Sequence, residues 1–245
     1  RLPASLALLA VGGYGRGELS PPSDIDVLVL LPEPPSPRLA SPLEELVGKL
    51  WDAGLELSHS VRTVAPCGEE ATKDVTVMTS LLEARLLAGN RGLFARFCRA
   101  RGECLDPQAF FKAKLLEQEQ RHTKFQDSPY SLEPNLKEAP GGLRDLQVIL
   151  WISRASSLGD SWADLAHRGL ITREEARQTL RHYRLLQDLR VRLHYAAMRR
   201  EDRLLFDYQE SLARALGYTA TAHRRAGEQL MQAYFRTAKA VTQLN

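Results

Sequence analysis

Two aspartates separated by a single residue, Asp24 and Asp26, stand at the head of the apolar run Ile25–Leu31. Residues two apart on a β-strand point to the same face, so both carboxylates are expected to project from one side of a strand. Paired carboxylates repel each other unless a cation lies between them, and oxygen ligands of this kind suit Mg²⁺. Two such ions can align an attacking oxygen with a departing pyrophosphate. The pair therefore predicts a divalent-metal site.

A glycine-rich turn, VGGYGRGE at residues 11–18, precedes the aspartates. The dinucleotide-binding pattern GxGxxG fails, because Glu18 stands where the third glycine is needed. The P-loop pattern also fails, because Glu18 occupies its lysine position. Gly12 and Gly13 still allow backbone N–H groups to approach phosphate oxygens closely. A phosphate cradle beside a metal site predicts nucleotidyl transfer, whereas a plain turn and a strand-capping aspartate are the structural alternative.

The residues around these motifs alternate between strand and helix signals. In chain order, the apolar patterns predict a strand at 6–13, a strand at 25–31, a helix at 43–53, a strand at 55–64 and a helix at 73–87. Gly54 is expected to end the first helix, and the five prolines of 32–42 predict a loop. Strands alternating with helices indicate an α/β domain over residues 1–106.

The second part of the chain has a helical pattern throughout. Charged and apolar residues at helical spacing predict helices at 107–125, 142–157, 172–199 and 221–244. Thr172 and Glu175 form a capping box at the start of the third of these. Apolar helical positions predict that three tryptophans lie in the core, namely Trp51, Trp151 and Trp162. Residues 107–245 are therefore expected to form an all-α domain.

Composition excludes several protein classes. No run approaches about 18 consecutive apolar residues, so no membrane span is expected, and 6–11 is too short for a signal peptide. The three cysteines lack CxxC spacing, which argues against disulfides or a zinc site and favours the cytoplasm. The formal net charge is only +3, and no basic tract is interleaved with aromatic residues, so a nucleic-acid partner is not expected.

The block GGYGRGELSPPSDIDVLVLL, residues 12–31, resembles the active-site block of the DNA polymerase β-like nucleotidyltransferase superfamily. Within that superfamily, the chain is similar to the bacterial PII uridylyltransferase/uridylyl-removing enzymes. Four further segments carry this resemblance: WD with HSVRT at 51–63, DVT with EARLLAG at 74–89, LEPNLKEAPGGLRD at 132–145 and RLLFD at 203–207. Together they span essentially the whole chain.

The resemblance implies a polymerase β-like nucleotidyltransferase domain of the α/β (α+β) class, with a small mixed sheet, followed by an all-α PII-uridylyltransferase-type domain. It implies transfer of UMP from UTP to a tyrosine hydroxyl of the PII nitrogen-regulatory protein. Mg²⁺ is the expected cofactor, and Mn²⁺ is expected to substitute for it. Asp24 and Asp26 match the catalytic metal-binding aspartates, and Gly12 and Gly13 match the nucleotide-binding glycines.

The superfamily uses a third carboxylate on a neighbouring strand. Glu56, on the predicted strand 55–64, is the first choice, and Asp74 is the alternative. Asp74 also stands at a predicted helix start, where an N-cap role is expected.

Three cations are candidate nucleotide ligands. Arg16 is either a phosphate contact or the partner of Glu18 or another acid, and pairing is favoured. Lys137 and Arg144 flank a Pro-Gly-Gly turn in the irregular stretch 126–141 and its following helix. They either hold the triphosphate or belong to an ordinary turn and a solvated helix start that carries Asp145.

The complete enzymes of the family also carry an HD phosphohydrolase domain and two ACT domains. None of the six histidines is followed by aspartate, so the chain is expected to be a fragment with the transferase part alone. Residues 168–245 carry 15 basic and 8 acidic residues, a candidate PII-docking surface or a solvated helix face. Adenylyl transfer to PII or another protein, and a catalytically silent nucleotide-binding module, remain open alternatives.

Overall fold

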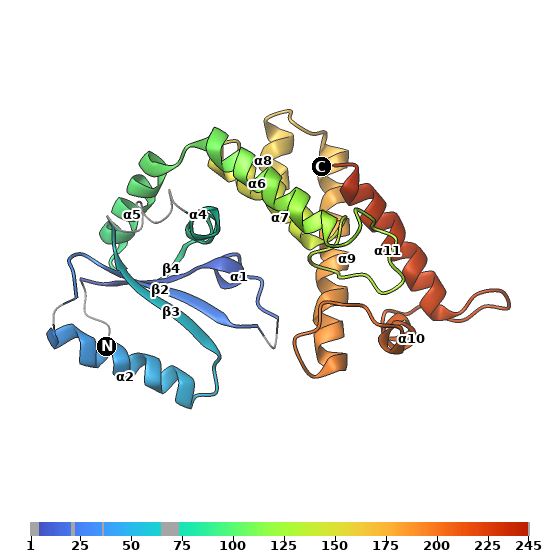
Figure 1. Ribbon diagram of the computed structural model, residues 1–245, viewed down its shortest axis with the longest axis horizontal. Helices are drawn as coiled ribbons and strands as arrows, with labels where there is room; N and C mark the ends of the chain where they lie inside the picture. The colour runs from blue at the N-terminus through green and yellow to red at the C-terminus, as the bar shows by residue number, and fades with distance from the viewer. Residues whose placement is uncertain (1–4, 21–22, 36, 65–73, 245) are drawn as a thin grey trace. The chain divides into compact units, whose positions relative to one another are not determined.

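The computed structural model describes residues 5–20, 23–35, 37–64 and 74–244, and the chain divides into two compact units, Arg1–Asp106 and Pro107–Asn245 (Figure 1). Among these described residues, no helix combines the length and the apolar character needed to cross a membrane. Cys98 and Cys104 are free thiols, and Cys67 lies outside the described residues.

The first unit is built on a four-stranded sheet with strand order β3-β2-β1-β4. The strands are β1 (Ala7–Ala10), β2 (Ile25–Leu31), β3 (Leu57–Thr63) and β4 (Arg85–Gly89). β1 is antiparallel to both β2 and β4, whereas β2 and β3 are parallel. The expected small mixed sheet is thereby confirmed. A parallel pair needs a crossover connection, which is the helix between β2 and β3.

Helices cover both faces of this sheet. They are α2 (Pro37–Asp52), α4 (Val75–Leu82) and α5 (Arg91–Cys104), whereas α1 (Gly12–Gly15) is a single turn that follows the end of β1. Leu43 of α2 packs with Leu6 and Val29 on one face, while α5 contacts β1 and β2, and Figure 1 shows α4 and α5 on the side opposite α2. Because both faces are covered, every residue from Val27 to Leu31 of β2 is buried.

The loop predicted at 32–42 is wrong in its second part. α2 begins at Pro37, and Pro42 lies inside it. Pro37 loses no hydrogen bond, since the first N–H groups of a helix have no intrahelical acceptor, whereas Pro42, the sixth residue of the helix, removes one such bond that the rest of α2 tolerates. Counting prolines therefore overestimated the loop, although the predicted helix at 43–53 and its end near Gly54, with φ +79°, are confirmed.

The helix predicted at 73–87 is wrong beyond residue 82. α4 ends at Leu82, and Arg85–Gly89 forms β4, with Arg85 opposite Ala10 and Gly89 opposite Ala7 in β1. Leucine and alanine favour helix in isolation. Here the N–H and C=O groups on one edge of β1 need backbone partners, which a neighbouring strand supplies. This strand pairing outweighs the helix propensity of the segment. Lys73 lies outside the described residues.

All the regular elements in the described part of the second unit are helices, as expected. Its helices are α6 (Pro107–Thr123), α7 (Leu143–Ala155), α8 (Trp162–His167), α9 (Arg173–Ala197), α10 (Phe206–Ala215) and α11 (Ala226–Thr242). The capping box of Thr172 and Glu175 at the start of α9 is confirmed. One large core includes Leu146, Leu186 and Tyr234. The pattern missed the short helices α8 and α10, as it missed α5 in the first unit.

Two of the three tryptophans lie in the core as predicted. Trp151 and Trp162 are buried, but Trp51 is 54% exposed. The Trp51 ring meets the His59 ring edge-on, with centroids 5.9 Å apart, and its indole N–H points to the Leu57 carbonyl. Trp51 stands near the end of α2 and contacts the edge strand β3, which leaves much of its ring exposed.

Candidate active site

The end of β1 leads directly into α1, the single helical turn that carries Gly12 and Gly13. The N–H of Val11 donates to the carbonyl of Asp26 (3.1 Å), which fixes the end of β1 beside the start of β2. Gly12 has φ +55°, a left-handed conformation that favours glycine. The strand predicted at 6–13 thus stops at Ala10, and the glycines form a turn beyond it.

The two aspartates stand at the start of β2, beside this turn. Asp24 is exposed and precedes the strand, whereas Asp26 is its second residue and is partly buried. A Cβ on Gly12 would lie 2.9 Å from Oδ2 of Asp26. The missing side chain of Gly12 therefore allows the backbone of the turn to approach the Asp26 carboxylate.

Arg16 follows the turn and bonds two acids. Its Nε donates to Glu18 Oε2 (2.7 Å), and its Nη1 lies 2.5 and 2.6 Å from the two carboxylate oxygens of Glu83. Burial disfavours the charged guanidinium, but the attraction of Glu83 and then Glu18 outweighs burial, so the pKa of Arg16 is raised. The pairing of Arg16 with acids, favoured on sequence, is confirmed.

The side chain of Arg85, the first residue of β4, binds backbone carbonyls of the same turn. Its Nη2 donates to the carbonyl of Tyr14 (2.9 Å), and its Nε donates to the carbonyl of Gly15 (3.2 Å). The Arg85 guanidinium also lies over the Tyr14 ring, 5.5 Å from its centroid. These contacts tie the turn to the strand that pairs with β1.

Glu56 lies one residue before β3 rather than on it, so the strand predicted at 55–64 is two residues too long at its start. Its carbonyl accepts a hydrogen bond from the N–H of Ile25 (2.7 Å), and its side chain is exposed. The parallel register pairs Asp26 with Ser58. Two residues earlier, the same register sets Glu56 opposite Asp24.

Asp74 is the N-cap of α4. Its side chain accepts a hydrogen bond from the N–H of Thr76 (2.7 Å), so the expected capping role is confirmed. Within the described ranges, no three or more His, Cys, Asp and Glu side chains are grouped in a way that could hold a metal ion.

Lys137 and Arg144 lie in the second unit, where both contact Glu138. Nζ of Lys137 is 3.5 Å and Nη2 of Arg144 is 3.0 Å from Oε1 of Glu138. Burial lowers the pKa of Lys137, and the Arg144 cation adds to this effect. Burial also opposes the ionisation of Glu138, but Arg144 and then Lys137 outweigh burial and lower the pKa of that carboxyl. The three side chains form one partly buried charge cluster.

The Pro-Gly-Gly turn beside this cluster is packed inside the unit. Asp145 is fully buried; it accepts hydrogen bonds from the N–H of Gly141 and from Nη2 of Arg121 (both 2.7 Å), and lies 2.9 Å from Nε2 of His122. Its position in the first turn of α7 is confirmed, but the solvated helix start considered on sequence is wrong. A Cβ on Gly141 would lie 2.3 Å from the carbonyl oxygen of Ala238.

Two known families match this sequence over different parts of it. Residues 109–245 match the GlnD PII-uridylyltransferase family, and residues 2–73 match the nucleotidyltransferase domain. The first match covers more than half of the chain. The chain belongs to the GlnD PII-uridylyltransferase family. Its first unit carries a nucleotidyltransferase domain.

Several curated proteins are similar to this GlnD-family chain along its whole length. The bifunctional uridylyltransferase/uridylyl-removing enzyme of Nitrosospira multiformis is 59% identical over 250 residues, which are 100% of this chain and 28% of that enzyme. The enzymes with the same name in Burkholderia lata and Cupriavidus pinatubonensis are 60% and 59% identical, over 99% and 100% of this chain and 28% of each enzyme. The chain thus spans 28% of the length of these relatives.

Sequence reasoning did not assign Glu83 or Arg85 to this GlnD-family site. An acid that directly follows the apolar end of a helix, and whose side chain is only 1% exposed, is an unusual burial that needs a cationic partner. That partner, Arg16, lies 67 residues earlier in the chain. A single sequence contains no signal that connects positions so far apart.

Proposed function

We propose that this chain transfers UMP from UTP to a tyrosine hydroxyl of the PII nitrogen-regulatory protein, releasing pyrophosphate. The observation that carries the proposal is the approach of the Gly12 backbone to the Asp26 carboxylate. It combines phosphate-binding N–H groups with metal-binding oxygens at one end of the sheet. Membership of the GlnD family and the names of the similar enzymes support the uridylyl group and the PII acceptor.

We assign residues 1–106 as the nucleotidyltransferase domain and residues 107–245 as the helical domain of PII-uridylyltransferase type. The compact units divide the chain at the same point, which supports this assignment. The cytoplasmic location, the absence of a nucleic-acid partner and PII docking on the basic helices stay predictions.

Asp24 and Asp26 fit a divalent cation such as Mg²⁺, with Mn²⁺ as a substitute. Both supply hard oxygen donors, and the exposure of Asp24 leaves room for water and phosphate ligands. The bound cation would neutralise phosphate charge. Glu56 is our first choice for a third carboxylate, because its backbone adjoins the start of β2. Asp74 already caps a helix and is the second choice.

In this reaction the tyrosine hydroxyl releases its proton to solvent and its oxygen forms a bond to the α-phosphorus, while the bond from that phosphorus to the departing pyrophosphate breaks. Such transfers depend mainly on positioning and on neutralising charge. The N–H groups of Gly12 and Gly13 orient phosphate oxygens. Lys137 and Arg144 are proposed to bind phosphate oxygens as cations. For Arg16, whose guanidinium holds two acids, we propose a role in shaping the nucleotide-binding turn.

The experiment that tests this function is label transfer from α-labelled UTP to a purified PII protein, with Mg²⁺ or Mn²⁺. The paired variant Asp24→Asn/Asp26→Asn removes the metal-binding charges, and ATP serves as the competitor. Transfer that the paired variant abolishes and ATP leaves unchanged is the expected result. Preferential transfer from labelled ATP would instead establish adenylyl transfer. A chain that binds no nucleotide with either metal would overturn the proposal.

A further inference from the structure

The glycine turn cannot hold its own shape. α1 has four residues, and its N-cap residue Val11 makes no side-chain capping bond. Isolated helices shorter than about 12 residues are marginal in water, and glycine increases the backbone entropy that order must overcome. The conformation of the turn must therefore come from the residues packed against it.

The first of these is Glu83, the C-cap residue that directly follows α4. Its carboxylate is 1% exposed and lies against Nη1 of Arg16 through both of its oxygens. Charge-assisted pairs of this geometry are among the stronger side-chain contacts. When one partner of a buried pair is removed, the other is left as an uncompensated charge. The side chain of Glu83 thus fixes the residue that directly follows α1.

The backbone of the same junction packs against the turn as well. A Cβ on Gly15 would lie 2.2 Å from the carbonyl oxygen of Glu83, so only glycine allows this approach. Two residues later, Arg85 donates to the carbonyls of Tyr14 and Gly15. Three consecutive residues, 14–16, are therefore held by Glu83, which follows α4, and by Arg85, which begins β4.

We infer that Glu83 and Arg85 are positioning residues of the active site. Glu83 acts through Arg16, Arg85 acts through the carbonyls of Tyr14 and Gly15, and together they set where the Gly12 and Gly13 N–H groups stand relative to Asp26. This inference rests on the proposed function, because the position of the turn matters when phosphate binds there. Arg16 is then a structural arm of the turn and does not bind phosphate directly.

The test compares UTP affinity in the unaltered chain, Glu83→Ala, Arg16→Ala and the variant with both changes. The two readings of Arg16 predict opposite results. If Arg16 bound phosphate directly, Glu83→Ala would release its guanidinium and leave UTP affinity unchanged or improved. If Glu83 is a positioning residue, Glu83→Ala raises the Kd for metal–UTP about tenfold above that of the unaltered chain. Because Glu83 and Arg16 act as one unit, the double variant is no worse than either single variant.

Two matched controls separate positioning from general damage. Glu45→Ala removes an ion pair on the surface of the same unit, in which Oε1 of Glu45 lies 2.6 Å from Nζ of Lys49. This variant leaves UTP affinity unchanged. Leu43→Ala removes core packing between α2 and the sheet. It lowers the melting temperature without changing the UTP Kd when binding is measured well below that temperature. The KM for PII stays within about twofold in Glu83→Ala, since the turn contacts the nucleotide and not the acceptor.

Hydrogen–deuterium exchange gives a second readout, independent of nucleotide. Glu83→Ala and Arg85→Ala speed the exchange of the peptide covering residues 11–18, and Glu45→Ala does not. If the unaltered chain binds UTP and Glu83→Ala matches Glu45→Ala in both affinity and exchange, the inference is overturned and the proposed function stands. If the unaltered chain binds no nucleotide, both fall together.

Discussion

Gly12 lies so close to Asp26 that a Cβ at Gly12 would stand 2.9 Å from the Oδ2 atom of that aspartate. The neighbouring atom is the end of a side chain, which can rotate away. Replacement of Gly12 should therefore disturb the carboxylate more than the stability of the fold. This relationship leads to the first prediction.

Gly12→Ala is expected to reduce nucleotidyl transfer by about tenfold or more, because the displaced carboxylate can no longer share a cation with Asp24. Gly17→Ala is the matched control. Gly17 also has a left-handed φ, +76°, but a Cβ there meets no atom within 4 Å. Each variant pays about 1 kcal/mol for the left-handed backbone. Steady-state transfer rates check the prediction, and equal losses in the two variants would contradict it.

Gly141→Ala is expected to destabilise the second unit severely. Gly141 has φ +77°, and its Cβ would lie 2.3 Å from the carbonyl oxygen of Ala238, a backbone atom that cannot move alone. The expected loss exceeds about 3 kcal/mol of unfolding free energy. Gly217→Ala has a similar φ, +87°, with no atom within 4 Å, and should lose about 1 kcal/mol. Urea unfolding measures both, and a difference below experimental error would refute the packing argument.

Asp145→Asn is expected to lower the unfolding free energy by about 3 kcal/mol, since it removes the carboxylate that lies 2.7 Å from the buried Arg121 and leaves that cation with the more distant carboxylate of Glu138, at 3.9 Å. The control is Asp188→Asn, which removes an exposed pair between Asp188 and Arg192 on α9. Such surface pairs contribute about 0.5 kcal/mol or less. Denaturant midpoints decide the comparison. Similar midpoints for the two variants would mean that the Asp145 cluster contributes little.

His182 predicts a pH dependence of stability. Burial lowers the pKa of its imidazole, and Arg181 adds to this effect. The unfolded chain, with a histidine pKa of about 6.5, binds more protons than the folded chain between the two pKa values. The contribution of His182 to the unfolding free energy is therefore fully present above about pH 7.5 and falls as the pH decreases through 6.5. Unfolding at several pH values should show this slope reduced in His182→Gln and unchanged in His223→Gln, which alters an exposed histidine. A slope that persists in full in His182→Gln would assign it to other groups.

Local patterns predicted the parts of the fold in which neighbouring residues decide the structure. β2 has the bounds read from its apolar run, Ile25–Leu31, because burial on both faces requires continuous hydrophobicity. The capping box at Thr172 needs only residues three positions apart. The strand β4 was missed, because the edge that recruits it belongs to β1, far earlier in the chain.

The same division holds for the candidate site. Asp24, Asp26, Gly12 and Gly13 lie within one short segment, so residue type and spacing indicate their chemistry together. Glu83 and Arg85 reach that segment only through the folded chain. A glutamate and an arginine between a helix and a strand are also common, so their residue types alone do not indicate a role in the site. Long-range pairing of this kind follows from packing, which spacing in one sequence does not encode.

The placement of β4 also fixes how short a working catalytic unit can be. The nucleotidyltransferase match ends at residue 73, but β1 pairs along its outer side with Arg85–Gly89. A recombinant piece cut at the end of that match would present the outer edge of β1 as an open row of N–H and C=O groups, which invites pairing with other chains. It would also lack both residues that brace the glycine turn. A piece that keeps both the strand pairing and the covered sheet of this unit must therefore continue through α5, which ends at Cys104 and contacts β1 and β2.

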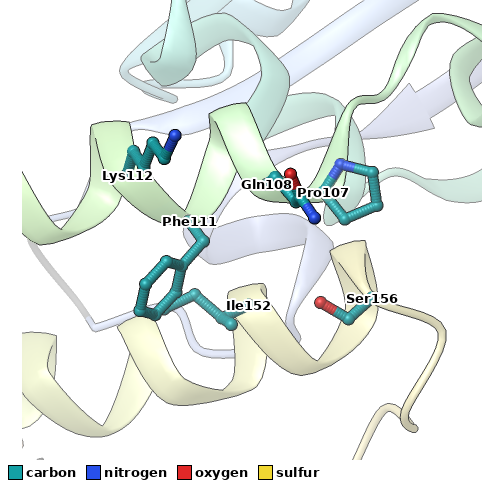
Figure 2. A pocket seen from close by; sticks show the side chains of 6 residues that line it. All are labelled: Pro107, Gln108, Phe111, Lys112, Ile152 and Ser156. Carbon is teal, nitrogen blue, oxygen red and sulfur yellow. The ribbon is translucent and has the colours of Figure 1, made fainter.

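A groove between α6 and α7 sets a similar limit on where the helical unit can begin. Pro107, Phe111 and Ile152 line it, with Lys112 at its rim (Figure 2). Because Pro107 is the first residue of the helical unit, a piece that begins after it would lack one of the residues that line this groove. The first unit thus needs its last helix, α5, and the groove of the second unit needs Pro107. A cleavage point that keeps both lies between Cys104 and Pro107.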